Sequence, residues 1–324
     1  MTDMTTNGPD GAGSHHDGLW RAFPKTRGEF EERFATEQAC REYLVQCRWN
    51  GEPACKRCGC KKVWPERDGT LFECSDCGHQ TSLTAGTLFH GTRKPLKDWY
   101  RAIFEVCVHR NGISSADLQR ILGFGSYGTA WHWTHKIRRA MVRKSRNKLD
   151  GCAQVDETLV GGKGATKEIV VVAAEENGRV RMTHAPGNHA EALKVVAERE
   201  IADKAAVKTD GNPAYGETSL GKREHDPKVQ TKAERKQADH LQLLHWMASN
   251  LKRWLLGTHH GGVRPKHLQS YLDEFCFRQN RRRTRGPARL IARCLEGLLD
   301  SPPLTKRQLI DETYECRLFQ YASY

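Results

Sequence analysis

Two aspartates stand where their carboxylates could share a metal site. Asp156 lies in CAQVDETLVGG, which alternates as a half-buried strand does, and Asp210 ends the apolar strand-like run AAVKTDG. On neighbouring strands, two carboxylates can hold a pair of divalent ions about 4 Å apart. One ion then activates an attacking oxygen, and the other stabilises the leaving oxygen of a phosphodiester. Hard oxygen ligands of this kind suit Mg²⁺.

Each aspartate also has a simpler explanation. An aspartate at the end of a strand is more often a turn cap than a metal ligand. Only a shared topology that brings both together favours the metal site. The neighbouring Glu157 should point to the opposite face of its strand, so we leave it out of the site.

Four cysteines form a second candidate metal site. Cys55 and Cys58 make one CxxC pair, and Cys74 and Cys77 make another after a gap of 15 residues. Each pair aims two thiolates at one point, and a hairpin turning at Asp68-Gly69 would bring the pairs together. Such a closed site holds structural Zn²⁺ and leaves no open position, so we assign it to folding and DNA docking. Cys60 and His79 are spare candidate ligands.

The elements around the two aspartates follow a recognisable order. A strand containing Asp156 precedes two strands within residues 168–185, a helix over 189–200, and the strand that ends in Asp210. Three strands, a helix and a strand are the order of an RNase H-like core. Its mixed sheet carries one aspartate on the first strand and another at the end of the fourth. We therefore predict an α/β fold with an RNase H-like catalytic core, preceded by a zinc ribbon and a helix-turn-helix segment.

The composition divides the rest of the chain. We predict five segments. The first two are a flexible leader at 1–27 and a segment at 28–90, which holds a helix over 29–47 and the zinc ribbon. A helix-turn-helix segment at 91–148, the catalytic domain at 150–285 and a tail at 286–324 without an assigned function complete the chain.

The helix-turn-helix prediction rests on caps and glycines. Ser114 or Ser115 can cap a helix through Leu122, a turn follows at 123–125, and a second helix runs through Met141. That second helix would present Lys136, Arg138 and Arg139 to DNA. The alternative is a small helical packing unit with a solvated basic face.

Charge and cysteine content agree with a DNA-binding protein. The net charge of +13 favours a polyanionic partner, and nucleic acid is the commonest one. Twelve cysteines with two CxxC pairs favour metal in a reducing compartment over disulfides. The apolar runs are much shorter than the roughly 20 residues that span a bilayer, and the start of the sequence lacks a hydrophobic signal. We expect a cytoplasmic protein.

Several motifs together resemble one family. They are the double CxxC, GISSADLQRILG followed by TAWHWTHKIRRAM, VDETLVGGK, TDGNPAY, SNLKRWLLGTHHGGV and HLQSYLDEFCFRQNRR, within residues 28–283. In this combination the chain resembles bacterial insertion-sequence transposases of the DDE type with an N-terminal zinc ribbon. The resemblance implies a core that cuts double-stranded DNA at the terminal repeats of an element and joins the freed 3′ hydroxyls to target DNA. It also implies that Asp156 and Asp210 are the first two acids of a catalytic triad.

The third acid is missing, because no carboxylate occurs between Asp239 and Asp273. In the related transposases this acid lies on a helix, with a basic residue seven positions later. His245 and Lys252 have that spacing, and a separation of seven leaves two side chains only about 20° apart around a helix. We therefore predict His245 as the third ligand and Lys252 as the basic residue.

Other assignments of the third position stay open. Asn250 is the main alternative, although it lies about 140° around the helix from His245. Glu234, Asp239 or no third ligand are further possibilities, and His245 is otherwise a core histidine. Because imidazole is a poorer ligand for Mg²⁺ than for Mn²⁺, we expect Mn²⁺ to support activity at least as well.

Further arginines are candidates for contacts with the DNA backbone. Arg253 follows Lys252 and would hold a phosphate, and three more arginines cluster after an aromatic helix: Arg278, Arg281 and Arg282. Because transposition brings two DNA ends together, we expect a homo-oligomer on DNA. The alternative function is a catalytically inactive, domesticated zinc-ribbon and helix-turn-helix protein that only binds DNA.

Overall fold

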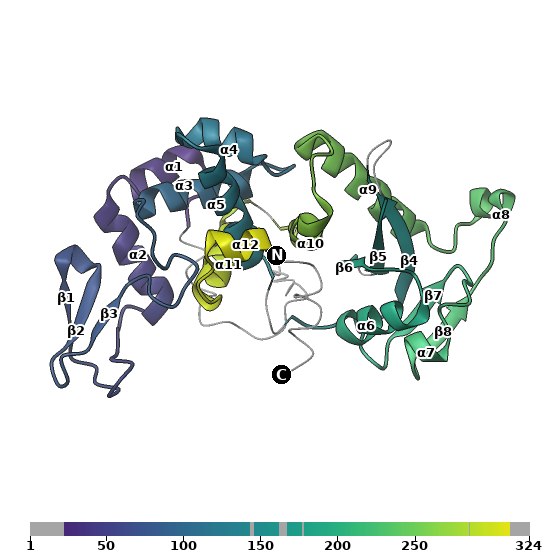
Figure 1. Ribbon diagram of the computed structural model, residues 1–324, viewed down its shortest axis with the longest axis horizontal. Coiled ribbons are helices and arrows are strands. Elements are labelled where there is room, and N and C mark those ends of the chain that lie inside the picture. The colour runs from purple at the N-terminus through teal and green to yellow at the C-terminus, as the bar shows by residue number, and fades with distance from the viewer. Residues whose placement is uncertain (1–22, 143–145, 162–166, 177, 285, 312–324) are drawn as a thin grey trace, which may run out of the picture. The chain divides into compact units, whose positions relative to one another are not determined.

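The computed structural model describes residues 23–142, 146–161, 167–176, 178–284 and 286–311 of the chain (Figure 1). These residues form two compact units. The first holds the described residues up to Asn147 together with Thr284–Lys306, and the second holds Lys148–Arg283 with the described residues from Arg307 onward. Most of the predicted leader and the end of the predicted tail therefore lie outside the described residues.

The first unit begins with two helices where the sequence predicted one. Helix α1 (Arg27–Arg33) and helix α2 (Glu37–Trp49) are separated at Thr36, whose backbone is extended and whose hydroxyl accepts a hydrogen bond from Ala39 N. This N-cap starts a new helix. Phe34, between the two helices, is fully buried, so apolar side chains continue through the break. The prediction of a single helix over 29–47 was therefore wrong.

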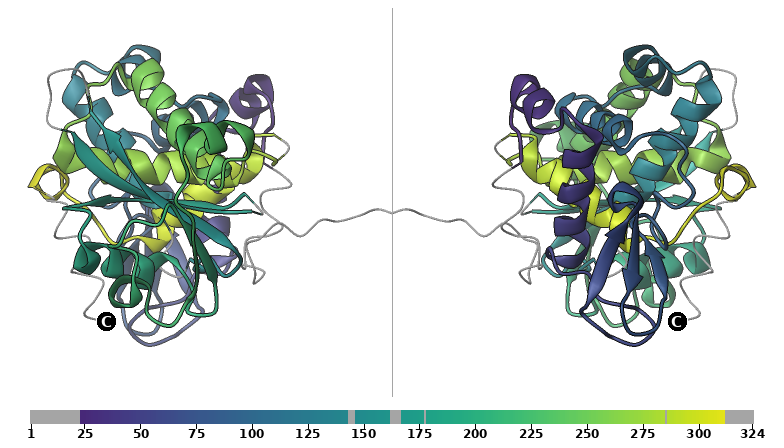
Figure 2. Two further views of the ribbon diagram at one scale, coloured as in Figure 1. Left: turned by 90° about the vertical axis from the view of Figure 1, so that its right-hand side faces the viewer. Right: turned by 90° about the vertical axis from the view of Figure 1, so that its left-hand side faces the viewer.

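A small antiparallel sheet follows, in the strand order β1 (Val63–Glu66), β2 (Leu71–Cys74), β3 (Gln80–Ser82). The three strands lie at the front of the right-hand view in Figure 2. The short helix η2 (Arg67–Gly69) joins β1 to β2, and Asp68 and Gly69 both have positive φ, at 57° and 78°. The predicted turn at these two residues is confirmed.

Three helices continue the first unit: α3 (Leu96–Val108), α4 (Ser115–Leu122) and α5 (Tyr127–Ala140). Ser114 caps α4 by accepting a hydrogen bond from Asp117 N at 3.1 Å, and Gly123 ends it in the left-handed region. The predicted pair of helices around a glycine turn is therefore present. Trp99 of α3 stacks on Trp133 of α5 with ring centroids 3.7 Å apart, which fixes the two helices to each other.

Part of the predicted tail belongs to this first unit. Helix α11 (Ala288–Asp300) packs on α3 and α5, and Leu88 N donates a hydrogen bond to the Leu298 carbonyl at 3.0 Å. A Cβ added to Gly297 would lie only 1.8 Å from the Ala140 carbonyl oxygen, so the two backbones meet at this glycine. Residues 288–300, to which the sequence assigned no role, thus complete a helical core.

The second unit is built on a five-stranded mixed sheet. Its strands, in spatial order, are β6 (Val180–Ala185), β5 (Glu168–Glu175), β4 (Ala153–Val160), β7 (Ala206–Thr209) and β8 (Glu224–Pro227). Strand β5 runs antiparallel to both β4 and β6, whereas β7 runs parallel to both β4 and β8. The order of three strands, a helix and a strand is confirmed. The short polar strand β8 was not predicted.

Helices cover both faces of this sheet (Figures 1 and 2). On one face lie α6 (Ala190–Glu200) and α7 (Glu217–Leu220), and on the other lie α9 (Gln242–His259) and α10 (Leu268–Asn280). Three short helices complete the description: α8 (Lys232–Gln237), η3 (Pro265–His267) and α12 (Lys306–Asp311). Among the described residues, no helix combines the length and apolar character needed to cross a bilayer.

Candidate active site

Strand register brings the two predicted aspartates to matching positions. In the parallel pair of β4 and β7, Gln154 lies opposite Lys208. Asp156 follows two residues later within β4, and Asp210 follows two residues later, directly after the last residue of β7. Because neighbouring strands lie about 4.8 Å apart, the two carboxylates share one end of the parallel pair.

Asp156 is held in a partly dehydrated environment. Its side chain is 17% exposed, and Oδ1 accepts a hydrogen bond from Glu157 N at 2.7 Å. Burial raises the pKa of this carboxyl and the nearby charge of Asp210 raises it further, whereas the Glu157 N–H and His245 oppose the rise. A buried carboxylate beside another carboxylate favours a cation between them.

Helix α9 presents His245 to this pair. The apolar stripe of α9 and of the residue before it is buried, at Leu241, Leu244, Ala248, Leu251 and Leu255. Leu244 N donates to Gln154 Oε1 at 3.1 Å, which ties the start of α9 to the strand that carries Asp156. His245, at the border of the stripe, is 34% exposed, and its Nε2 lies 3.9 Å from Asp156 Oδ2.

The other ring nitrogen of His245 contacts a residue that the sequence indicated only as a minor alternative ligand. Nδ1 lies 2.7 Å from Asp239 Oδ2, and Asp239 Oδ1 accepts from Leu241 N at 3.0 Å. Partial burial would raise the pKa of Asp239, but the hydrogen bonds from His245 and Leu241 outweigh it and lower the pKa. Asp239 precedes the helix by only a few residues, and no periodic pattern marks it as a partner of His245.

Glu157 lies on the other side of the sheet from His245. Its Oε1 accepts a hydrogen bond from the Tyr215 hydroxyl at 2.8 Å, and Tyr215 packs in the same core as Val155. Burial raises the pKa of Glu157 to about 7, with the charge of Asp156 adding to the rise. The expectation that Glu157 and Asp156 use opposite faces agrees with these contacts, whereas the role of Tyr215 was not predicted.

The remaining candidates on α9 are nearer to solvent. Asn250, the alternative third ligand, accepts a hydrogen bond from the Arg253 guanidinium through Oδ1. Lys252 and Arg253 are exposed. Of His245 and Asn250, His245 is therefore the better candidate for the third ligand, because its Nε2 lies near the carboxylate of Asp156.

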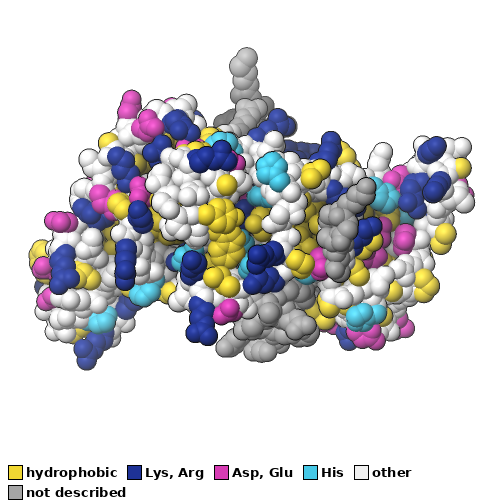
Figure 3. Space-filling view, turned by 45° about the horizontal axis from the view of Figure 1, so that its top comes forward, with side chains coloured by type: hydrophobic (Ala, Val, Ile, Leu, Met, Phe, Trp, Pro, Cys, Tyr) yellow, Lys and Arg dark blue, Asp and Glu magenta, His cyan; other side chains and the backbone are white. Residues whose placement is uncertain are grey.

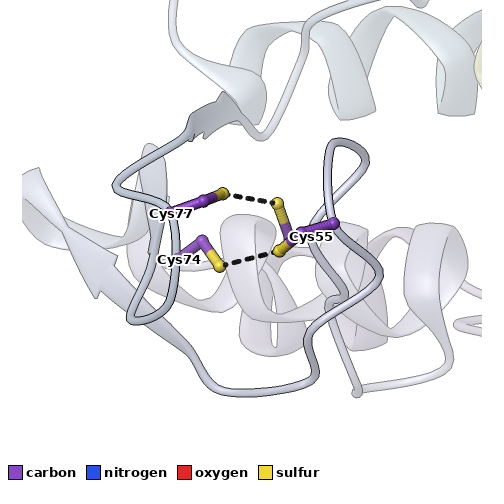
Figure 4. A group of neighbouring side chains, drawn as sticks. Cys55, Cys74 and Cys77 are labelled. Atoms are coloured by element: carbon purple, nitrogen blue, oxygen red, sulfur yellow. Dashed lines mark hydrogen bonds between the residues drawn. The ribbon is translucent and has the colours of Figure 1, made fainter.

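The four cysteines of the CxxC pairs form one group in the first unit. All four sulfurs lie within 4.8 Å of one another, and Figure 4 shows those of Cys55, Cys74 and Cys77 turned toward a common centre. The Sγ atoms of Cys55 and Cys77 are 3.6 Å apart, far longer than a disulfide bond. Sulfurs bound to Zn²⁺ at about 2.3 Å lie about 3.8 Å apart in a tetrahedron, so the group fits a structural zinc ion. The spare candidates Cys60 and His79 are not members of the group.

Comparison with known proteins decides the family. Residues 148–280 match the family model of the ISXO2-like transposase domain, and residues 35–80 match that of the transposase zinc-ribbon domain. The chain belongs to the insertion-sequence transposases with an N-terminal zinc ribbon. An uncharacterised protein of the transposable element ISH50 from Halobacterium salinarum is 24% identical over 277 residues, which cover 76% of this chain and 92% of that protein. The matched transposase domain includes Asp156, Asp210 and His245.

The predicted basic face of α5 in this transposase-family chain needs correction. Lys136 is 5% exposed, its ammonium donates to the Leu88 carbonyl at 2.7 Å, and burial lowers its pKa. Arg138 is 2% exposed. Both side chains therefore lie inside the first unit and do not form a surface for DNA. Arg139 is half-buried. We predicted that these charged side chains are exposed because basic residues usually face solvent. A long basic side chain can nevertheless be buried when a carbonyl oxygen accepts a hydrogen bond from its charged group.

The arginines in the last turn of α10 and directly after it also have partners within the protein. Arg278 bonds to buried Glu274 at 2.8 Å, and its side chain is 10% exposed. Arg282 donates to the Gln279 and Gly178 carbonyls, and Arg281 lies over the Phe277 ring. Arg278 is thus placed as a packing residue, against the expectation of a free phosphate contact. Lys and Arg are scattered over the face drawn in Figure 3, with acidic side chains among them.

Proposed function

We propose that the chain is a DNA transposase that uses divalent metal ions to cut DNA at the ends of its element and to join the freed 3′ hydroxyls to target DNA. One observation carries the proposal. Asp156, Asp210 and His245 come together at one end of the sheet, within the residues that match the ISXO2-like transposase domain. The transposase and zinc-ribbon domains imply that DNA is the partner.

The sheet supports an RNase H-like core. In its strand order β6-β5-β4-β7-β8, the first strand of the domain, β4, lies at the centre. The antiparallel strands β5 and β6 follow on one side, and the parallel strands β7 and β8 follow on the other. This is the mixed sheet that the proposed mechanism requires, because it sets the ends of β4 and β7 side by side.

The donor atoms fit a divalent cation. Two carboxylates supply hard oxygen ligands, and His245 supplies one nitrogen. Bound Mg²⁺ or Mn²⁺ would lower the pKa of the attacking hydroxyl group and stabilise the charge that develops on the leaving oxygen.

Protein residues would hold the DNA around this site. Lys252 lies on nearly the same face of α9 as His245 and is exposed, so its ammonium can reach a phosphate. Exposed Arg253 can offer a two-pronged contact to the same backbone. We assign the zinc ribbon to DNA docking, because four thiolates saturate the ion and leave no position for a substrate.

Metal binding tests this proposal against a protein that only binds DNA. Zinc-loaded protein is titrated with Mn²⁺ while the free ion is followed by electron paramagnetic resonance. We expect Asp156→Asn and Asp210→Asn to weaken binding at least about tenfold. Glu198→Gln is the matched control, since it removes a carboxylate that is 60% exposed on α6. Equal Mn²⁺ binding by all four proteins would favour the catalytically inactive DNA-binding protein.

We further propose that the chain acts as a homo-oligomer on DNA, because joining two element ends requires two active sites in one complex. Light scattering of the protein with an end duplex should then give a mass of at least two chains. A complex that contains only one chain under conditions that support cleavage would contradict this part of the proposal.

A further inference from the structure

The His245 ring connects two carboxylates through different nitrogens. Nδ1 lies 2.7 Å from Asp239 Oδ2, and Nε2 lies 3.9 Å from Asp156 Oδ2. The first distance is that of a hydrogen bond, and the second is too long for one. An ion with ligand bonds of about 2.1 Å can span a gap of up to about 4.2 Å, so one cation can reach both Nε2 and Asp156.

The contact with Asp239 determines which nitrogen carries the proton. An ionised carboxylate only accepts hydrogen bonds, so Nδ1 must donate. In a neutral imidazole the other nitrogen then has a free lone pair. An aspartate side chain is ordinarily ionised at neutral pH, and Asp239 Oδ1 accepts a hydrogen bond from Leu241 N. The free lone pair of His245 therefore lies on Nε2, toward Asp156.

We propose that Asp239 is a positioning residue for the metal site: it fixes His245 in the Nδ1–H tautomer and orients Nε2 toward the cation. This inference rests on the proposed function. A carboxylate behind a ligating histidine also makes the ring a stronger donor. Asp239 thereby places a negative charge next to a ligand that has none of its own.

Asp239 acts through His245 and not as a ligand itself. Both of its oxygens are already engaged, Oδ2 with the His245 ring and Oδ1 with Leu241 N at the start of α9. In direct coordination, an oxygen that already accepts one of these hydrogen bonds would have to bind the cation as well. A positioning role and a direct-ligand role of Asp239 predict different Mn²⁺ affinities when Asp239 and His245 are both changed.

The variant Asp239→Asn separates positioning from helix capping. Asparagine keeps the size of the side chain and an oxygen for Leu241 N, but its NH₂ group would face Nδ1 and favour the opposite tautomer. In ¹⁵N-histidine-labelled full-length protein, the His245 signals are identified by their loss in His245→Ala. We expect an Nδ1–H ring in the wild type and a shift toward Nε2–H in Asp239→Asn. Unchanged nitrogen shifts would overturn the inference.

A double-mutant cycle on Mn²⁺ affinity tests the route of action. Asp239→Asn alone should weaken Mn²⁺ binding about 10- to 100-fold. In the His245→Ala background the same change should have no further effect, because the ring that Asp239 orients is gone. A further loss of the same size in that background would make Asp239 a direct ligand and contradict its role through His245.

The Asp156→Asn variant distinguishes the two possible failures. If Asp156→Asn loses Mn²⁺ and Asp239→Asn binds it like wild type, the positioning role is wrong while the metal site stands. If Asp156→Asn binds Mn²⁺ like wild type, the proposed function itself fails.

Discussion

A histidine in place of a third carboxylate makes the proposed metal site less negative by one charge. Mn²⁺ accepts nitrogen more readily than Mg²⁺ does. We therefore predict that Mn²⁺ supports DNA cleavage at least as fast as Mg²⁺ at equal concentration. Initial rates on one labelled duplex would measure this, and a clear preference for Mg²⁺ would argue against His245 as a ligand.

Glu157 should make stability depend on pH. Burial raises its pKa from 4.5 to about 7. Between these values the unfolded chain ionises first, so the stabilisation present below pH 4.5 is lost as pH rises through 7. Without added Mg²⁺ or Mn²⁺, the melting temperature of the wild type should fall more from pH 5 to pH 8 than that of Glu157→Gln. An equal fall in melting temperature from pH 5 to pH 8 for the two proteins would refute this prediction.

At the residue scale, sequence spacing predicted the elements that carry the candidate ligands, but it did not predict the residues that contact those ligands. Asp156, Asp210 and His245 follow from strand and helix periodicity, which the structure reproduces around them. The pairing of Asp239 with His245 depends on how the segment before α9 folds back, and no local pattern encodes that. The hydroxyl of Tyr215 reaches Glu157 for a similar reason, across 58 positions of sequence.

At the element scale, the absence of a side chain at Gly297 allows α11 to pack closely on α5. An alanine normally stabilises a helix by up to about 1 kcal/mol relative to glycine. In Gly297→Ala the new methyl group would meet the Ala140 carbonyl at 1.8 Å, so we expect a net loss of about 1–3 kcal/mol.

Gly257→Ala is the matched control for this prediction. Gly257 also lies in a helix, α9, but no atom lies within 4 Å of its added Cβ. Urea unfolding followed by circular dichroism would compare both variants with the wild type. A Gly297→Ala protein as stable as Gly257→Ala would show that α11 does not pack on α5 in solution.

Elements with strong local signals were predicted well. The hairpin turn at Asp68 and Gly69 and the glycine turn after α4 follow from residues that adopt positive φ. The break at Thr36 was missed because the buried aromatic residues continue on both sides of it. Strand β8 was missed because its sequence, EHDP, is polar apart from one proline and lacks the apolar alternation of a strand.

At the scale of the whole molecule, the zinc group should support only the first unit. Cys55→Ser removes a ligand and should release the zinc ion, with loss of order in the small sheet. Cys60→Ser is the control, because Cys60 is outside the group of four. Zinc content by mass spectrometry and Mn²⁺ binding would be measured together. Retention of one zinc ion per chain by Cys55→Ser would contradict the assignment.

The chain path could not be deduced from the sequence. Residues 284–306 follow the second unit in sequence but belong to the first, because α11 buries its apolar side chains against α3 and α5. A hydrophobic periodicity shows that a helix needs a partner and does not say which one. The finer division into five segments therefore stays a prediction.

The most direct test of the account is a strand-transfer reaction. The DNA that flanks the gene is prepared as a labelled duplex and incubated with a second duplex, the protein and Mn²⁺ or Mg²⁺. We predict that the wild type and Glu198→Gln nick the duplex at a repeat end and join it to the second duplex, and that Asp156→Asn and His245→Ala do neither. Wild-type protein that shifts the duplex in a gel but never breaks it with either metal would contradict the account.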